Sequence, residues 1–171
     1  MKKIGVTIIL ILLILTASAS VLATHKLGLD REAVKDISKA KRATDKYQNV
    51  KNAIRDGYIS TEFCVENPEL GAMGIHYMNP MLMDNVINVK KPEALLYLPT
   101  KRGLKLVGVE YFIPSSETNV TPMLFGKNFD GPMPGHSPEM PEHYDFHAWI
   151  WKHNPSGIFS QFNPAINCQN N

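Results

Sequence analysis

The sequence has only two cysteines and no strong excess of charge of either sign. Its eighteen basic side chains include Lys2 and Lys3, and without these two the basic and acidic side chains are equal in number, at sixteen each. A chain without net positive charge has little attraction for nucleic acid, so we predict no nucleic-acid partner. Repeats and low-complexity tracts are also missing, and neither cysteine has the close partner cysteine that structural zinc sites use.

The longest apolar run lies at the start of the chain. Two lysines, an apolar stretch and then small residues follow one another within residues 1–23. This is the order of a secretory signal peptide, and we predict cleavage after Ala23, or after Ala19 as second choice. The alternative is an uncleaved membrane anchor over residues 4–23. Either way we predict that residues 24–171 form a single secreted or extracytoplasmic domain, which contacts a membrane only through an uncleaved N-terminus.

The two cysteines allow one disulfide. In an oxidising compartment an even number of cysteines favours a disulfide, here between Cys64 and Cys168. It would close a loop of about 100 residues, which the chain-entropy model values at about 4–5 kcal/mol. Two thiolate ligands to a metal are the less favoured alternative.

The chain after residue 29 has the pattern of one helix followed by strands. Residues 30–56 carry apolar side chains at steps of three or four, which predicts an amphipathic helix with Asp30 as N-cap and Gly57 just beyond its end. Strands are predicted over residues 73–78, 93–98, 104–113 and 143–151, with a hairpin turn at 100–103. Loops are predicted over residues 64–74 and over the proline-rich segment 114–142, which carries a glycosylation sequon at Asn119.

These elements predict an α+β fold. We expect one N-terminal amphipathic helix packed on a curved antiparallel sheet of about four strands. A small β-barrel with the helix outside is the alternative. The oligomeric state is left open.

Residues 143–151, HYDFHAWIW, place several polar groups on one side of a predicted strand. Side chains alternate along a strand, so His143, Asp145 and His147 share a face with Trp149 and Trp151. His143 and His147 are about 13 Å apart on a straight strand, too far for one ion. Neighbours two apart can share a site, so we expect His147 to act with Asp145 or His143 as ligand or orienting group.

Two further residues interrupt apolar strands. Glu110 lies between Gly108 and Phe112 on one face, and a buried carboxylate needs a cation, a metal or a hydrogen-bond network. The alternative is a Glu110 that points to water. His76 follows two glycines, which let a backbone pass close to a neighbour. A histidine in this position is more often a core residue than a ligand.

Together these residues form a candidate metal site. His76, Glu110, His143 and His147, with Asp145 as alternative or orienting group, suit zinc, iron, manganese or copper. We expect the proline-rich segment to cover the site and Trp149 or Trp151 to flank it. The methionines favour copper only weakly, because methionine also fills cores.

Three parts of the sequence resemble one family. They are CVENPELGAMGIHYMNP (64–80), PEALLYLP with LVGVEYFIP (92–114), and LFGKNFDGPMPGHSPEMPEHYDFHAWIWKHNPSGIFSQFNPAINC (124–168). These segments resemble a family of small exported prokaryotic proteins without an assigned activity. The resemblance covers most of residues 24–171 and implies one domain, export and the two cysteines. It implies no reaction.

Three functions fit the sequence. The first is an exported protein that binds a metal ion or a small molecule in a pocket of the sheet. The second is an enzyme that uses the same residues, with a metal-activated water or with Glu110 as a general base. The third is a protein-interaction module in which the histidines are structural.

Overall fold

The computed structural model describes residues 29–135 and 140–169, so the predicted signal peptide lies outside the described residues. In chain order the elements are α2 (Arg31–Thr44), η1 (Asp45–Gln48), α3 (Val50–Arg55), β1 (Ile59–Asn67), β2 (Gly71–Met78), η2 (Pro80–Leu82), β3 (Ala94–Thr100), β4 (Gly103–Pro114), η3 (Ser115–Glu117), β5 (Met123–Leu124), β6 (Lys127–Asn128), β7 (Asp130–Met133) and β8 (His143–Ala148). None of the described helices is long and apolar enough to cross a bilayer.

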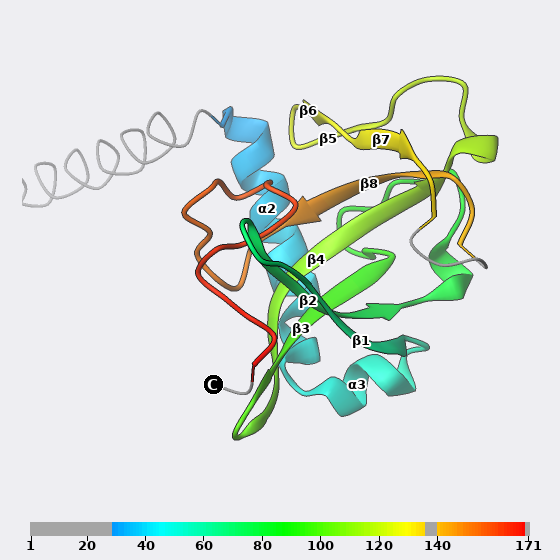
Figure 1. The fold of residues 1–171 in the computed structure, drawn as a ribbon. Coiled ribbons are helices and arrows are strands. Elements are labelled where there is room, and N and C mark those ends of the chain that lie inside the picture. Colours follow the sequence, from blue (N-terminus) through cyan, green and yellow to red (C-terminus); the bar gives the residue numbers. More distant parts are fainter. Residues whose placement is uncertain (1–28, 136–139, 170–171) are drawn as a thin grey trace, which may run out of the picture.

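The sheet is larger than the sequence predicts. Six antiparallel strands follow the order β1-β2-β3-β4-β8-β7, and β5 and β6 form a separate two-stranded hairpin. The sheet is strongly curled, and α2 packs along one side of it (Figure 1). Among the described strands β1 and β7 are the two edges, so the sheet is an open half-barrel rather than a closed barrel. The α+β fold is confirmed, and the expected four strands are corrected to six.

Both additional strands are irregular edges of the sheet. β1 pairs with β2 through register shifts, and Glu62 within it has a φ of 66°. Such a strand is largely exposed and lacks a regular apolar pattern, which explains the wrong prediction of a loop from residue 64. β7 includes Pro132, and proline is tolerated at a sheet edge because no ladder hydrogen bond is needed there.

The helical region is interrupted, and it begins at Arg31 rather than at the N-terminus of the chain. Asp30 is the N-cap of α2, as predicted, and accepts a hydrogen bond from Ala33 N. After Thr44 the chain turns through η1, and the side chain of Asn49 caps α3 by accepting from Lys51 N. A side chain that caps a new helix competes with continuation of the first one, so residues 30–56 form two α-helices joined by η1 instead of one α-helix.

The face of the sheet that packs against α2 is called the helix face here. Its core joins the helices to β2, β3, β4 and β8 and includes Ala33, Ala40, Tyr47, Tyr58, Tyr77, Leu95, Tyr97, Leu106, Val109, Tyr111, Phe146 and Ala148. Three of its buried tyrosines donate hydrogen bonds to backbone carbonyls: Tyr58 to Pro92, Tyr97 to Tyr47 and Tyr111 to Val89. The polar atoms that reach this core are therefore matched to acceptors.

The opposite face, called the inner face here, carries His76, Glu110 and His147. Two separate apolar clusters are buried on it. One consists of Ala72, Leu96, Leu98, Val107, Trp149 and Ile166, with Cys168 packed against it. The other consists of Met78, Ala94 and Phe112, with Met83 and Met140 packed against it.

A disulfide links β1 to the C-terminal segment. Cys64 and Cys168 form the predicted bond across a sequence separation of 104 residues. The C-terminal segment also pairs with β2, through a bridge between Ala72 and Asn163, and it runs beside β1 and β2 in Figure 1. This covalent link indicates an oxidising compartment. It also fixes Ile166 and Cys168 over the inner face.

Candidate metal-binding site

Three strands each supply one ligand to the inner face. His76 lies on β2, Glu110 on β4 and His147 on β8. Glu110 is directly opposite His147 across β4 and β8, and it is directly opposite Ala94 on β3. His76 is opposite Leu96, the residue two places further along β3. The three side chains therefore point to the same side of the sheet.

The three side chains converge. One potential ligand atom from each of His76, Glu110 and His147 lies within 4.8 Å of the other two. Nε2 of His76 is 3.4 Å from Oε2 of Glu110, and the centroids of the two imidazole rings are 6.0 Å apart. β2 and β8 are three strand steps apart, about 14 Å in a flat sheet. The approach of the rings therefore requires the sheet to curl toward the inner face.

Small residues around the site let the strands and side chains approach. Gly74, two residues before His76, has a φ of 98°, and a Cβ there would lie 2.6 Å from Tyr97 O. A side chain at this position would thus collide with β3, which confirms the predicted close approach of the backbone. At Gly108 a Cβ would lie 3.1 Å from Leu96 Cδ1. On β3, which lies between β2 and β4, residue 94 is an alanine. Its short side chain leaves space on the inner face between β2 and the Glu110 carboxylate.

Glu110 is a buried acid whose partner is an imidazole. Its side chain is 5% exposed, and Oε2 accepts no hydrogen bond from the described residues. Burial, with repulsion from Asp145 and Glu93, raises the pKa of Glu110 well above its ordinary value. In the described part of the chain its basic neighbour is the His76 imidazole, which is charged only when protonated, and no lysine or arginine pairs with it. A metal cation would reverse this shift, because it stabilises the ionised carboxylate.

Asp145 stands beside His147 on β8. Oδ1 of Asp145 is 3.9 Å from Nδ1 of His147, and both side chains are almost completely buried. Burial, with repulsion from Asp130 on β7, raises the pKa of Asp145 to about 7. A carboxylate on one side of an imidazole fixes which ring nitrogen faces a metal. The position of Asp145 suits this orienting role, and Asp145 is not one of the three converging residues.

His143 lies outside the group of three. It shares the strand β8 with His147, and its Nδ1 lies 3.0 Å from the carbonyl oxygen of Pro141. Its ring stacks on Phe112 at a centroid distance of 4.5 Å. The imidazole is fully buried and belongs to the packing around the second apolar cluster.

The two tryptophans lie on different faces. β8 ends at Ala148, earlier than the predicted Trp151, so the alternation of side chains stops there. Trp149 packs in the inner-face cluster with Leu96, whereas Trp151 donates to Thr44 Oγ1 on the helix face. Trp149 therefore shares the inner face with the three converging side chains, and Trp151 does not.

The proline-rich segment is more ordered than predicted. It contains η3 and the short strands β5, β6 and β7, which the prediction of a loop over residues 114–142 missed. β7 pairs with β8, and Met140 packs on the inner-face cluster of Met78 and Phe112. Residues 136–139, with Pro138, lie outside the described residues.

One buried acid near the site was not singled out from the sequence. Glu93 is 3% exposed, and its Oε2 accepts a hydrogen bond from Phe112 N. Burial raises the pKa of Glu93 to about 8. The sequence contained a signal for this residue, because Glu93 directly precedes the apolar residues 94–98. An acid beside apolar strand residues is the same kind of signal that identified Glu110.

The ligand types and spacing fit a transition-metal ion. Two ligand atoms about 2.1 Å from a tetrahedral ion are about 3.4 Å apart, which is the observed separation of His76 Nε2 and Glu110 Oε2. The upper limit of 4.8 Å for the group requires a small rotation of one side chain to complete such a site. No family model, no curated protein and no solved structure matches this chain. The interpretation of the site therefore depends on its geometry alone.

Proposed function

We propose that this chain is an exported domain that binds one divalent transition-metal ion through His76, Glu110 and His147. The observation that carries the proposal is the convergence of two imidazoles and a carboxylate from three strands. Two imidazoles with one carboxylate are a ligand set of zinc and iron proteins, and they also suit copper and manganese.

The charge of the inner face supports the proposal. Glu110 and Asp145 are both buried, and among the described residues the basic side chains close to them are histidines, which are charged only when protonated. Two ionised carboxylates and one divalent cation would give a neutral site, whereas in the metal-free protein burial favours the protonated form of both acids. Nε2 of His147 is the proposed ligand atom, because Asp145 lies toward Nδ1.

His76 gives an ion access to the site. Its side chain is 12% exposed, compared with 1% for that of His147. An ion would first meet His76 and then be held by the two deeper ligands. The hydrogen-bonded sheet holds the three strands in place before the ion arrives, which lowers the conformational cost of binding.

The test uses the full chain purified without a histidine tag. We expect the protein to bind one equivalent of zinc or cobalt in a calorimetric titration, and cobalt to develop visible absorption. Glu110→Gln should weaken binding at least about tenfold while it preserves the shape of the side chain. Affinity should also fall as pH decreases, because protons compete for the ligands.

The exposed His153 provides the matched control. His153→Asn should bind the ion as the unmodified protein does, whereas His147→Asn should not. If the unmodified chain takes up no ion, or if Glu110→Gln and His147→Asn both retain its affinity, the proposal is wrong and the cluster is structural.

A further inference from the structure

The methionines of the buried apolar clusters are concentrated beside the proposed site. Of the three such clusters among the described residues, only the one with Met78, Ala94 and Phe112 contains methionine, and Met83 and Met140 pack against it. The other inner-face cluster is filled by Leu96, Leu98, Val107, Trp149 and Ile166. A thioether is also a soft metal ligand, so methionines beside a group of histidines and a carboxylate are candidate ligands.

Met78 belongs to the same row of the sheet as two proposed ligands. Met78 is opposite Ala94, Ala94 is opposite Glu110, and Glu110 is opposite His147. Residues directly opposite each other on adjacent strands point to the same face. Met78 also follows His76 by two residues on β2, so these two side chains share the inner face as well.

Only a methyl group separates Met78 from Glu110 within this row. The Ala94 side chain is the one between them, and it is fully buried. Strands two steps apart are about 10 Å apart in a flat sheet, and the curl toward the inner face shortens the distance between side-chain ends. Methionine is unbranched with three rotatable bonds, so the buried Met78 thioether can extend over Ala94 toward the three ligands.

A thioether beside two imidazoles changes which metal the site prefers. Zinc, manganese and iron sites of the histidine–carboxylate type do not need sulfur, whereas copper accepts imidazole, carboxylate and thioether together. Thioether and imidazole stabilise copper(I), and the carboxylate stabilises copper(II). Building on the proposed function, we propose that the ion is copper and that Met78 Sδ joins His76, Glu110 and His147 as the fourth ligand.

The first experiment compares Met78→Leu with the unmodified full chain. Copper(I) affinity is measured without oxygen, by competition with a coloured copper(I) chelator, and zinc affinity by calorimetry. Met78→Leu should lose at least about tenfold in copper(I) affinity and keep its zinc affinity within about threefold. Met123→Leu is the matched control, because Met123 is 59% exposed on β5, and it should change neither value.

The second experiment does not depend on a variant. X-ray absorption of the copper(I)-loaded, unmodified chain should contain a copper–sulfur contribution beside the copper–nitrogen one. Leucine for methionine nearly conserves volume, so Met78→Leu is expected to fold, and its unfolding midpoint checks this.

The outcomes separate the two proposals. If zinc and copper(I) binding fall together in Met78→Leu, or if copper(I) affinity is unchanged, Met78 is not a ligand and the copper assignment is wrong. A spectrum without a copper–sulfur contribution overturns the assignment in the same way. In each of these cases the proposed function stands as long as the unmodified chain binds zinc and Glu110→Gln weakens that binding. If neither ion binds to the unmodified chain, the proposed function itself fails.

Discussion

The two faces of the sheet differ in the partners of their buried polar groups. On the helix face, Tyr58, Tyr97 and Tyr111 each donate to a backbone carbonyl. On the inner face, Glu110 and Asp145 are buried acids whose pKa values are raised, and they face histidines. A sheet optimised for stability alone would resemble the helix face on both sides, since buried acids are costly. The difference supports the proposal that the inner face binds a metal ion.

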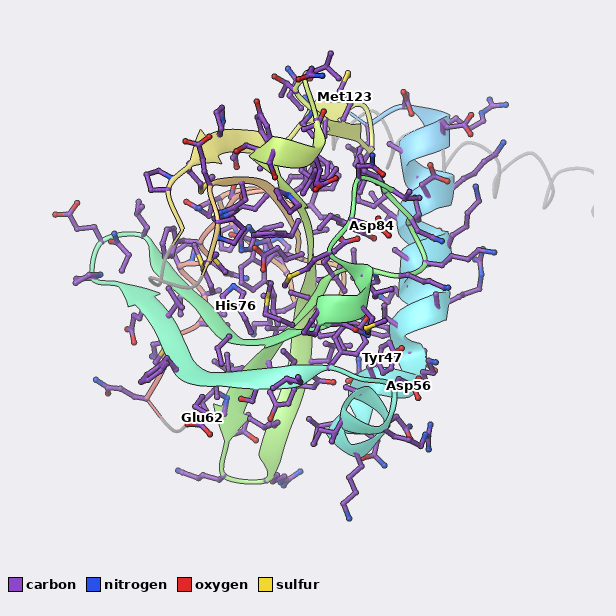
Figure 2. The ribbon with its side chains drawn as sticks, turned by 90° about the vertical axis from the view of Figure 1, so that its right-hand side faces the viewer. Tyr47, Asp56, Glu62, His76, Asp84 and Met123 are labelled. Atoms are coloured by element: carbon purple, nitrogen blue, oxygen red, sulfur yellow. A yellow bond between two sulfur atoms is a disulfide. The ribbon has the colours of Figure 1, made fainter. Side chains whose placement is uncertain are left out.

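The contrast extends to the packing of the two faces. The helix-face core is continuous from the helices to β8, whereas the inner face has two apolar clusters with polar residues placed between them. In Figure 2, His76 is separated from α2, and Tyr47 lies close to the helix. The helix face therefore provides the stability with which the inner face can hold its buried acids.

The largest expected effect comes from removing the disulfide that links β1 to the C-terminal segment over the inner face. Replacing Cys64 and Cys168 together by serine should lower the free energy of unfolding by about 4–5 kcal/mol, because the bond closes a loop of 104 residues. Urea unfolding followed by circular dichroism measures the loss. Hydrogen exchange should accelerate in β1 and β2 more than in α2. Equal acceleration in both would mean that the two faces do not differ in this respect.

A smaller effect concerns the buried acid Glu93. Its folded-state pKa of about 8 is above the ordinary 4.5, so the folded state holds the proton longer than the unfolded chain does. Its contribution to stability is complete below pH 4.5 and decreases as pH rises to about 8, by at most about 1.4 kcal/mol per pH unit.

Glu93→Gln should remove this part of the pH dependence and leave the hydrogen bond from Phe112 N in place. The contribution of Glu93 to the pH dependence is measured from unfolding free energies at several pH values. The control is Glu117→Gln, because Glu117 is exposed. Identical slopes in the unmodified chain and Glu93→Gln would contradict the buried, protonated state.

The third prediction concerns a larger side chain at position 94 of β3. Ala94→Leu adds bulk between Met78 and Glu110, and it should cost about 1–3 kcal/mol while it abolishes metal binding. Its neighbour Leu95 points to the helix face, so Leu95→Met should cost less than about 1.5 kcal/mol and leave metal binding intact. Metal titration of both variants compares the two faces at adjacent positions. Retained binding in Ala94→Leu would place the site elsewhere.

The smallest effect concerns one hydroxyl of the helix face. Tyr97→Phe removes the 2.6 Å hydrogen bond to Tyr47 O and leaves that carbonyl without this donor. The expected loss is about 1–2 kcal/mol in urea unfolding, without a change in metal affinity. A change in metal affinity would show that the two faces are coupled.

The regular parts of the fold were predictable from local patterns. The N-cap at Asp30, the hairpin between β3 and β4, and β8 from His143 follow from capping, turn and alternation rules. β1 was missed because its register shifts and exposure leave no apolar alternation. The break between α2 and α3 was missed because the apolar side chains keep their helical spacing across Asn49, whereas the backbone of Asn49 is extended and interrupts the helix.

The candidate site was predictable in its residue types and only partly in its membership. Alternation on β8 placed His143, Asp145 and His147 on one face, and an acid within an apolar strand identified Glu110. Choosing among His143, Asp145 and His147 required the strand order, because β4 sets only His147 opposite Glu110. Glu93 and Met78 were not selected as site residues, since neither differs locally from a residue at a strand end.

The sequence by itself determined the regular strands β2, β3, β4 and β8, the single cysteine pair and the alternation of side chains as far as Ala148, because these depend on spacing along the chain. The tertiary structure alone decided that His76 meets Glu110 and His147. That meeting depends on the order of β2, β3, β4 and β8 and on the curl of the sheet, which long-range packing sets. No local pattern records how far a sheet bends, so the convergence of the three ligands becomes visible only in the folded chain.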